Sequence, residues 1–141
     1  MSHPDPRSAL YRLIEAGQLA HQALLVPLRE RGLEPGDDAV LFALGEAAGA
    51  SEANLAETLG LPDEALTQRL ARLIDRDLVA RQQIDDIPIP GFELTERGVR
   101  MRALLADHWA ELEEALFGEL KPKQRKGFGK TLKRFVELLR L

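Results

Sequence analysis

The most informative part of this sequence is residues 51–81, SEANLAETLGLPDEALTQRLARLIDRDLVAR, which predicts two short helices, a tight turn between them, and a following strand. Ser51 is placed to cap the first helix, because its hydroxyl can accept a hydrogen bond from an unpaired amide of the first turn. Gly60 can end that helix, since glycine readily adopts the left-handed conformation of a helix end. Pro62 suits the first turn of the second helix. We interpret this segment as a helix-turn-helix.

The second predicted helix has one apolar face and one polar face. Its apolar residues recur at helical spacing: Leu66, Leu70, Leu73 and Ile74. The other face carries side chains that can donate hydrogen bonds to base edges or phosphates: Thr67, Gln68, Arg69 and Arg72. A recognition helix of a DNA-binding protein needs such a face. The pattern alone leaves one alternative open, an ordinary helical hairpin whose polar face is simply solvated.

Length and composition set the class of protein. A chain of 141 residues is long enough for one domain with a real core. The absence of cysteine excludes disulfides and thiolate metal sites. No apolar segment approaches the roughly 20 residues of a membrane span, and the N-terminal MSHPDPRS lacks the apolar region of a signal peptide. We therefore expect a soluble, cytoplasmic protein without a membrane partner.

The net charge of −4 hides an uneven distribution. Residues 1–120 contain 11 basic and 22 acidic residues, whereas residues 121–141 contain 8 basic and 1 acidic residue. Within the second part, residues 121–130 (KPKQRKGFGK) form a basic segment. We expect a solvated loop that balances the acidic body, and the alternatives are a second contact with nucleic acid or a site for an acidic ligand.

The flanking segments predict further helices and a β-hairpin. A long first helix is expected to open with Asp5 as its cap and Pro6 at its first position, and to end near Gly32. A shorter helix should follow around residues 40–48. Residues 78–84 and 92–94 predict two strands with a proline-containing tip between them. Thr95 is expected to cap another long helix, and a final helix should contain residues 128–139.

The predicted fold is mainly α: a winged helix-turn-helix with a two-stranded β wing, flanked by N- and C-terminal dimerisation helices. It forms a single domain over residues 1–141, with residues 34–98 as the DNA-binding part and residues 1–33 and 99–141 as the dimerisation part. The outer helices have more apolar surface than a small winged domain can cover, so we expect a homodimer. A monomeric bundle is the alternative.

Four short motifs carry a resemblance to a known family. They are NLAETL at residues 54–59, ALTQ at 65–68, LVAR at 78–81 and LTERG at 94–98. In this order and spacing the sequence resembles the multiple antibiotic resistance regulator (MarR) family, whose members are dimeric winged-helix repressors or activators of bacteria and archaea. The resemblance covers essentially the whole chain. It implies a transcriptional regulator with double-stranded DNA as its partner. The sequence has no phosphate-binding glycine loop, no cysteine and no HExxH motif, so we expect neither an enzyme nor a cofactor.

The resemblance also implies functional residues. The positions that would contact DNA are Thr67, Gln68, Arg69, Arg72 and Arg81. In the wing, Asp86 matches the family's aspartate, but Pro88 occupies the position of the arginine that enters the minor groove. Many members bind small aromatic anions, and the candidate ligand-binding residues here are His21, Arg100, His108 and Trp109. Each of these four also has an ordinary structural explanation.

The charge of the predicted DNA-binding face is unfavourable. Between residues 61 and 81, four arginines are offset by four acidic residues, Asp63, Glu64, Asp75 and Asp77. Residues 82–93 contain acidic residues but no basic one. Because cations near phosphates favour binding and carboxylates oppose it, we expect modest, salt-dependent affinity for DNA. A winged-helix protein-interaction module that has lost or weakened DNA binding is the alternative.

Overall fold

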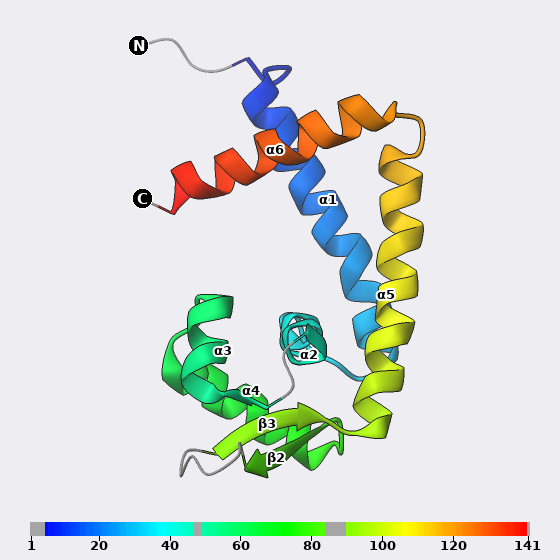
Figure 1. Cartoon of the computed structure of the whole chain (residues 1–141). Helices are drawn as coiled ribbons and strands as arrows, with labels where there is room; N and C mark the ends of the chain where they lie inside the picture. The colour runs from blue at the N-terminus through cyan, green and yellow to red at the C-terminus, as the bar shows by residue number, and fades with distance from the viewer. Residues whose placement is uncertain (1–4, 47–48, 84–89, 141) are drawn as a thin grey trace. The chain divides into compact units, whose positions relative to one another are not determined.

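The computed structural model describes residues 5–46, 49–83 and 90–140 (Figure 1). Its helices are α1 (Ala9–Glu30), α2 (Asp37–Glu46), α3 (Glu52–Leu59), α4 (Asp63–Asp75), α5 (Glu96–Phe117) and α6 (Pro122–Leu139). Its strands are β1 (Ala50–Ser51), β2 (Val79–Gln83) and β3 (Pro90–Leu94). Residues 1–106 and 107–141 form two compact units, and α5 begins in the first and ends in the second. The mainly α, winged fold predicted from the sequence is confirmed.

The helix-turn-helix forms for the local reasons that the sequence indicates. The Ser51 hydroxyl accepts a hydrogen bond from the Asn54 amide at 3.1 Å, which caps α3. Gly60 ends α3 in the left-handed conformation with a φ of 65°, and its amide donates to the Ala56 carbonyl. Pro62 is the N-cap of α4, one residue before the helix begins. These three signals therefore fix the turn between α3 and α4.

A small antiparallel sheet follows, with strand order β1-β3-β2. Val79 lies opposite Leu94 on the two strands predicted as a hairpin. The additional strand β1 pairs Ala50 with Phe92 and joins the start of α3 to the sheet. A two-residue strand has no periodicity to detect, so the sequence did not indicate it. The predictions for Asp86 and Pro88 concern the wing tip and lie outside the described residues.

The core of the first unit is built around α4. Leu66 and Leu73 are completely buried, and Leu70 is nearly so. They pack in a core that also contains Leu41 and Val40 of α2, Leu55 of α3 and Phe92 of β3. Since the apolar stripe of α4 faces this core, its Thr67 and Gln68 positions face outward and are exposed.

The start of α1 differs from the prediction. Asp5 does not cap the helix; its Oδ1 accepts a hydrogen bond from the Arg7 amide at 2.8 Å in a preceding turn. The cap is Ser8, whose hydroxyl accepts from the Tyr11 amide at 3.4 Å. The prediction that Asp5 caps this helix and Pro6 begins it was therefore wrong. The Asp5 side chain accepts from the amide two residues later and so forms a turn before the helix, which is a common alternative to capping. The predicted end near Gly32 is confirmed.

The basic segment at residues 121–130 is helical, so the prediction of a loop was wrong. Pro122 begins α6, where its missing amide removes no helical hydrogen bond. The Gln124 Oε1 accepts from the Lys121 amide at 3.1 Å, and Arg125 donates to the Phe117 carbonyl at 2.7 Å. The Phe117 and Phe128 rings lie 5.5 Å apart between centroids. These contacts offset the low helix propensity of the two glycines in the segment.

Candidate nucleic-acid interface

Thr67 and Gln68 lie on the exposed face of α4. The Thr67 hydroxyl lies 2.8 Å from the Asp63 carbonyl oxygen and also contacts the Glu52 carboxylate at the start of α3. Thr67 thus connects the two helices of the helix-turn-helix while it remains at the surface. The neighbouring Gln68 presents an amide, which can both donate and accept hydrogen bonds.

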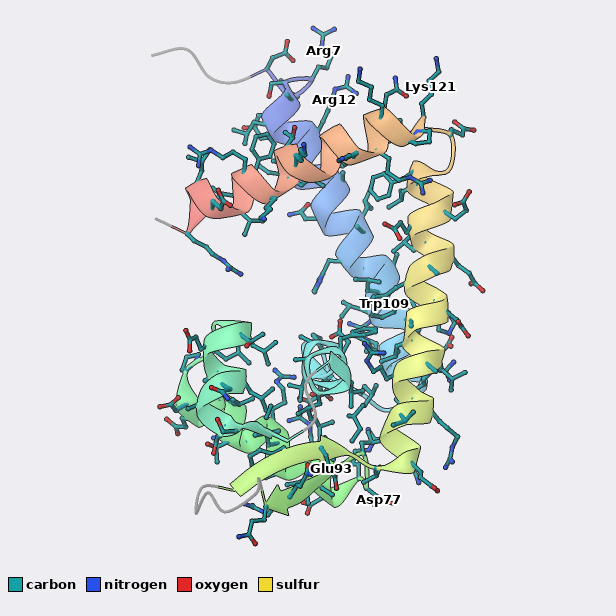
Figure 2. All side chains as sticks on the ribbon, in the orientation of Figure 1. Arg7, Arg12, Asp77, Glu93, Trp109 and Lys121 are labelled. Carbon is teal, nitrogen blue, oxygen red and sulfur yellow. The ribbon has the colours of Figure 1, made fainter. Side chains whose placement is uncertain are left out.

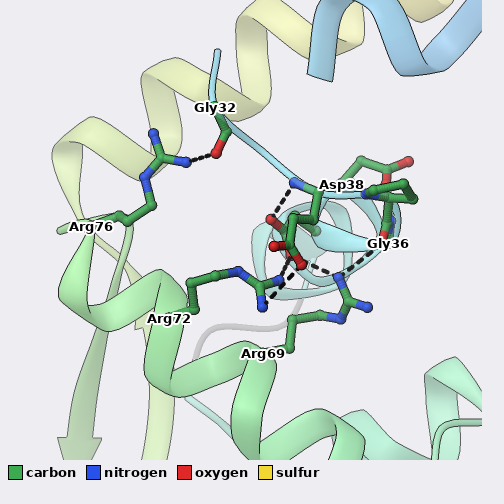
Figure 3. A network of polar contacts seen from close by, with 9 residues as sticks. Gly32, Gly36, Asp38, Arg69, Arg72 and Arg76 are labelled. Carbon is green, nitrogen blue, oxygen red and sulfur yellow. Dashed lines mark hydrogen bonds and ion pairs between the residues drawn. The ribbon is translucent and has the colours of Figure 1, made fainter. Parts of the chain in front are cut away.

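Arg69 and Arg72 reach back into the chain (Figure 3). The Arg69 Nη1 donates to Asp37 Oδ1 at 2.7 Å and to the Pro35 carbonyl at 2.9 Å. The Arg72 Nη2 donates to the same Asp37 oxygen at 2.6 Å, and its Nη1 pairs with Glu34 at 3.2 Å. Both arginines were predicted DNA contacts, and the structure places them against the segment that precedes α2.

Arg76 extends this arrangement by one turn. Its guanidinium donates to the Gly32 carbonyl and, at 3.0 Å, to the Arg31 carbonyl. The contacts of Arg69, Arg72 and Arg76 all fall within residues 31–37, which we call the anchoring segment. The anchoring segment runs from the C-cap of α1 to the first residue of α2. The guanidinium groups of the three arginines fix it to α4 and the end of that helix.

Asp37 is the charged centre of these contacts. Its side chain is 1% exposed, and besides both arginines it accepts a hydrogen bond from the Glu34 amide at 2.8 Å through Oδ2. Burial of a carboxylate is costly unless charged partners and hydrogen bonds compensate, and here they do. Asp37 was not among the predicted site residues, because an aspartate at a helix start resembles a local cap and its partner Arg69 is 32 residues away.

Arg81 lies on β2 and is exposed. It is directly opposite Phe92 of β3, with its guanidinium carbon 5.8 Å from the centre of the Phe92 ring. A cation above an aromatic face is attracted by the ring's quadrupole. This contact holds the Arg81 charge at the surface of the sheet, on the strand that leads to the wing tip.

The surface around α4 is more acidic than the equal numbers of arginines and acidic residues in residues 61–81 indicate. Asp63, Glu64, Asp75 and Asp77 are exposed, and Figure 2 shows Asp77 beside the sheet. Three of the four arginines that offset them in sequence are engaged with the anchoring segment. The exposed acidic charge near α4 is therefore only partly balanced by its own arginines.

The four candidate ligand-binding residues lie on two helices. His21 on α1 and Arg100 on α5 are exposed, and both belong to the first unit. His108 and Trp109 are half-buried on the part of α5 that belongs to the second unit (Figure 2). A ligand site formed by these residues stays a prediction. Among residues 5–46, 49–83 and 90–140, no group of three or more histidine and acidic side chains is arranged to hold a metal ion.

Helix α3, the turn, helix α4 and the β2–β3 hairpin define a winged helix-turn-helix protein. Comparison with solved structures gives the particular fold, which is that of MarR-family transcriptional regulators. AbsC, a MarR-family regulator from Streptomyces coelicolor, is 25% identical with a TM-score of 0.81, over 99% of this chain and 98% of AbsC. The sequence resemblance is thus confirmed at the level of the fold.

Two further structures are similar over nearly their whole length. MepR of Staphylococcus aureus, solved as a complex with DNA, is 15% identical with a TM-score of 0.83, over 96% of this chain and 99% of MepR. The PcaV transcriptional regulator of Streptomyces coelicolor, solved with its natural ligand, is 21% identical with a TM-score of 0.77, over 97% of this chain and 98% of PcaV. No family model matches the sequence, and no curated protein matches it. In the described part of the chain, no helix has the length and apolar character needed to cross a membrane.

Proposed function

We propose that this protein is a DNA-binding transcriptional regulator in which α4 enters the major groove. The observation that carries the proposal is the outward, polar face of α4 within a winged helix-turn-helix. The fold similarity to MepR, which was solved with DNA, supports it. The neighbours are transcriptional regulators and not enzymes, which supports a role in regulation.

Gln68 is the residue most suited to base contact. Its side chain is exposed on α4, and a glutamine amide can form two hydrogen bonds with adenine in the major groove. Thr67 is placed beside it, and Arg81 offers a cation to the phosphate backbone from β2. Because Asp63 and Glu64 are exposed at the start of α4, affinity for DNA should be modest and should fall steeply with salt.

Fluorescence polarisation with duplex DNA from upstream of the protein's own gene tests this proposal. Gln68→Ala should weaken binding about tenfold, since a bidentate base contact contributes about 1–3 kcal/mol of discrimination. Gln18→Ala, which removes an exposed glutamine on α1, is the control. It should keep the mass of the unaltered protein in light scattering and leave DNA binding unchanged. If the unaltered protein bound no duplex even at low salt, the proposal would fail in favour of a protein-interaction module.

We further propose a homodimer with residues 1–33 and 99–141 as its dimerisation part. In the first unit, α1 exposes large apolar side chains: Leu10, Tyr11, Ile14, Leu19 and Val26. In the second unit, α6 exposes Phe128, Phe135, Val136, Leu138 and Leu139. Such surfaces favour association because burying them removes apolar area from water. Light scattering should give twice the chain mass of 15.7 kDa, and a monomeric mass would contradict the proposal.

A repressor controlled by a small aromatic anion is the finer form of this function. The PcaV structure contains a natural ligand. In the second unit of the present chain, His108 and Trp109 are groups for an anion or an aromatic ring, and in the first unit the exposed Arg100 is a group for an anion. Benzoate is a suitable probe. Benzoate added to the protein–DNA complex should release DNA from the unaltered protein and should release less DNA from the Trp109→Ala variant. If benzoate did not release DNA from the unaltered protein, small aromatic anions of this kind would not be its effectors.

A further inference from the structure

We infer that Asp37 is a positioning residue for the recognition helix, acting through Arg69 and Arg72. The inference rests on the proposed function, because it assigns these arginines to the orientation of α4 in place of direct contact with DNA. Figure 3 shows their guanidinium groups converging on one side of the anchoring segment. Asp37 contacts α4 through Arg69 and Arg72 and would influence DNA through that helix.

The spacing of the arginines makes the arrangement rigid. Arg69 and Arg72 of α4 and Arg76, the C-cap residue of that helix, stand three and four residues apart, so they lie on one side of the helix and of its end. Each donates a hydrogen bond to the anchoring segment, at 2.9 Å for Arg69 to Pro35 and 3.0 Å for Arg76 to Arg31. A helix held at three successive points along one side cannot rotate about its axis without breaking these bonds.

Two glycines in the anchoring segment fit the same arrangement. Gly36 has a φ of +96°, and a Cβ atom there would lie 2.9 Å from the guanidinium of Arg69. Gly32 has a φ of +70°, and a Cβ atom there would lie 3.0 Å from a guanidinium nitrogen of Arg76. Both positions favour glycine for their conformation and leave room for an arginine head group. The segment is thus shaped to receive arginines from α4.

The low exposure of the Arg69 and Arg72 side chains favours a positioning role over contact with phosphates. The Arg69 side chain is 19% exposed and donates to two oxygens of the anchoring segment, Asp37 Oδ1 and the Pro35 carbonyl. Arg72 is 34% exposed and is shared between buried Asp37 and Glu34, whose side chain is 62% exposed. If Arg69 moved to contact a phosphate, the buried carboxylate of Asp37 would lose one of its two cationic partners, which is costly.

The orientation of α4 matters because Gln68 is adjacent to Arg69. Successive helical residues differ by about 100° around the axis, so holding Arg69 against the core side fixes the direction in which Gln68 points. Base contacts tolerate little displacement, because hydrogen bonds weaken steeply with distance and angle. Loss of the Asp37 contact should therefore remove the benefit of Gln68 while α4 remains helical.

A double-mutant cycle between Asp37→Asn and Gln68→Ala tests this coupling by polarisation, with circular dichroism to show that each variant is folded at the assay temperature. In the Asp37→Asn background, Gln68→Ala should change affinity less than about twofold, against about tenfold in the unaltered protein. If the two effects simply multiply, Asp37 only stabilises the fold and the inference is wrong.

Arg69→Gln provides a second variant in case Asp37→Asn does not fold. If Arg69 is a positioning residue, Arg69→Gln should weaken binding without changing the slope of log K against log salt, whereas loss of a phosphate contact reduces the magnitude of that negative slope by about one. A shallower slope for Arg69→Gln would overturn the inference. Arg81→Gln, at an exposed arginine, is the matched control and should make the slope shallower.

Hydrogen exchange separates this inference from the proposed function. In the absence of DNA, Asp37→Asn or Arg69→Gln should accelerate exchange of α4 amides more than that of α1 amides. This measurement applies even if the unaltered protein binds no duplex, an outcome that would refute the proposed function alone. Unchanged exchange of α4 would show that the contacts with Asp37 do not hold the helix.

Discussion

Replacing Gly98 with alanine should destabilise the protein, although alanine is the better helix former. Gly98 is buried in the first turn of α5, and a Cβ atom there would lie 2.0 Å from the Leu78 carbonyl oxygen. That oxygen also accepts a hydrogen bond from the Thr95 amide at 3.2 Å. Thr95 Oγ1 in turn accepts from the Gly98 amide at 3.0 Å and donates to the Asp77 carbonyl at 2.6 Å. The helix start therefore cannot move away without losing its cap.

The expected magnitude follows from these opposing effects. Alanine in place of a helical glycine contributes about 1 kcal/mol of stability where nothing else changes. Carbon and oxygen normally approach to about 3.3 Å, so the backbone would have to move by about 1 Å. Overpacking of this kind costs about 1–3 kcal/mol, and loss of the Thr95 cap costs about 1 kcal/mol more. We expect a net loss of roughly 1–3 kcal/mol.

Urea denaturation followed by circular dichroism measures this change. The matched control is Gly127→Ala on α6, where an added Cβ atom meets no atom within 4 Å and the residue is exposed. The control should be unchanged or up to about 1 kcal/mol more stable. If Gly98→Ala were as stable as the control variant, the close approach of α5 to Leu78 would not be the reason for glycine at this position.

Two other changes test the helix-turn-helix. Ser51→Ala should lower the free energy of unfolding by about 1 kcal/mol, because the Asn54 amide loses its hydrogen-bond acceptor. Ser51→Asp keeps an acceptor and should be nearly as stable as the unaltered protein. Equal stability of all three proteins in urea denaturation would exclude a stabilising cap. Leu66→Ala should lower the free energy of unfolding by about 2–5 kcal/mol, since Leu66 is 0% exposed. A loss of less than about 1 kcal/mol in urea denaturation would contradict the packing of α4 on the core.

The parts of the fold that the sequence predicts are those governed by near neighbours. Ser51 caps α3 through an amide three residues away, and Gly60 ends α3 by its own conformation. Gly98 appeared only as the last position of a motif, and its physical reason is the Leu78 carbonyl oxygen, just before β2, which no local pattern reveals. Asp5 shows the limit of local rules, since the same side chain suits both a helix cap and the turn in which it is found.

The candidate site depends on pairings that sequence distance conceals. In the sequence, the charges of Asp63 and Glu64 offset those of Arg69 and Arg72. In the structure the arginines pair with Asp37 and Glu34, which leaves the carboxylates of Asp63 and Glu64 exposed at the N-terminal end of α4. Negative charge is favourable for the helix dipole there but unfavourable beside a phosphate. If α4 enters DNA as proposed, the exposed carboxylates oppose its attraction to phosphates, so binding should depend on correctly placed contacts such as Gln68 more than on charge.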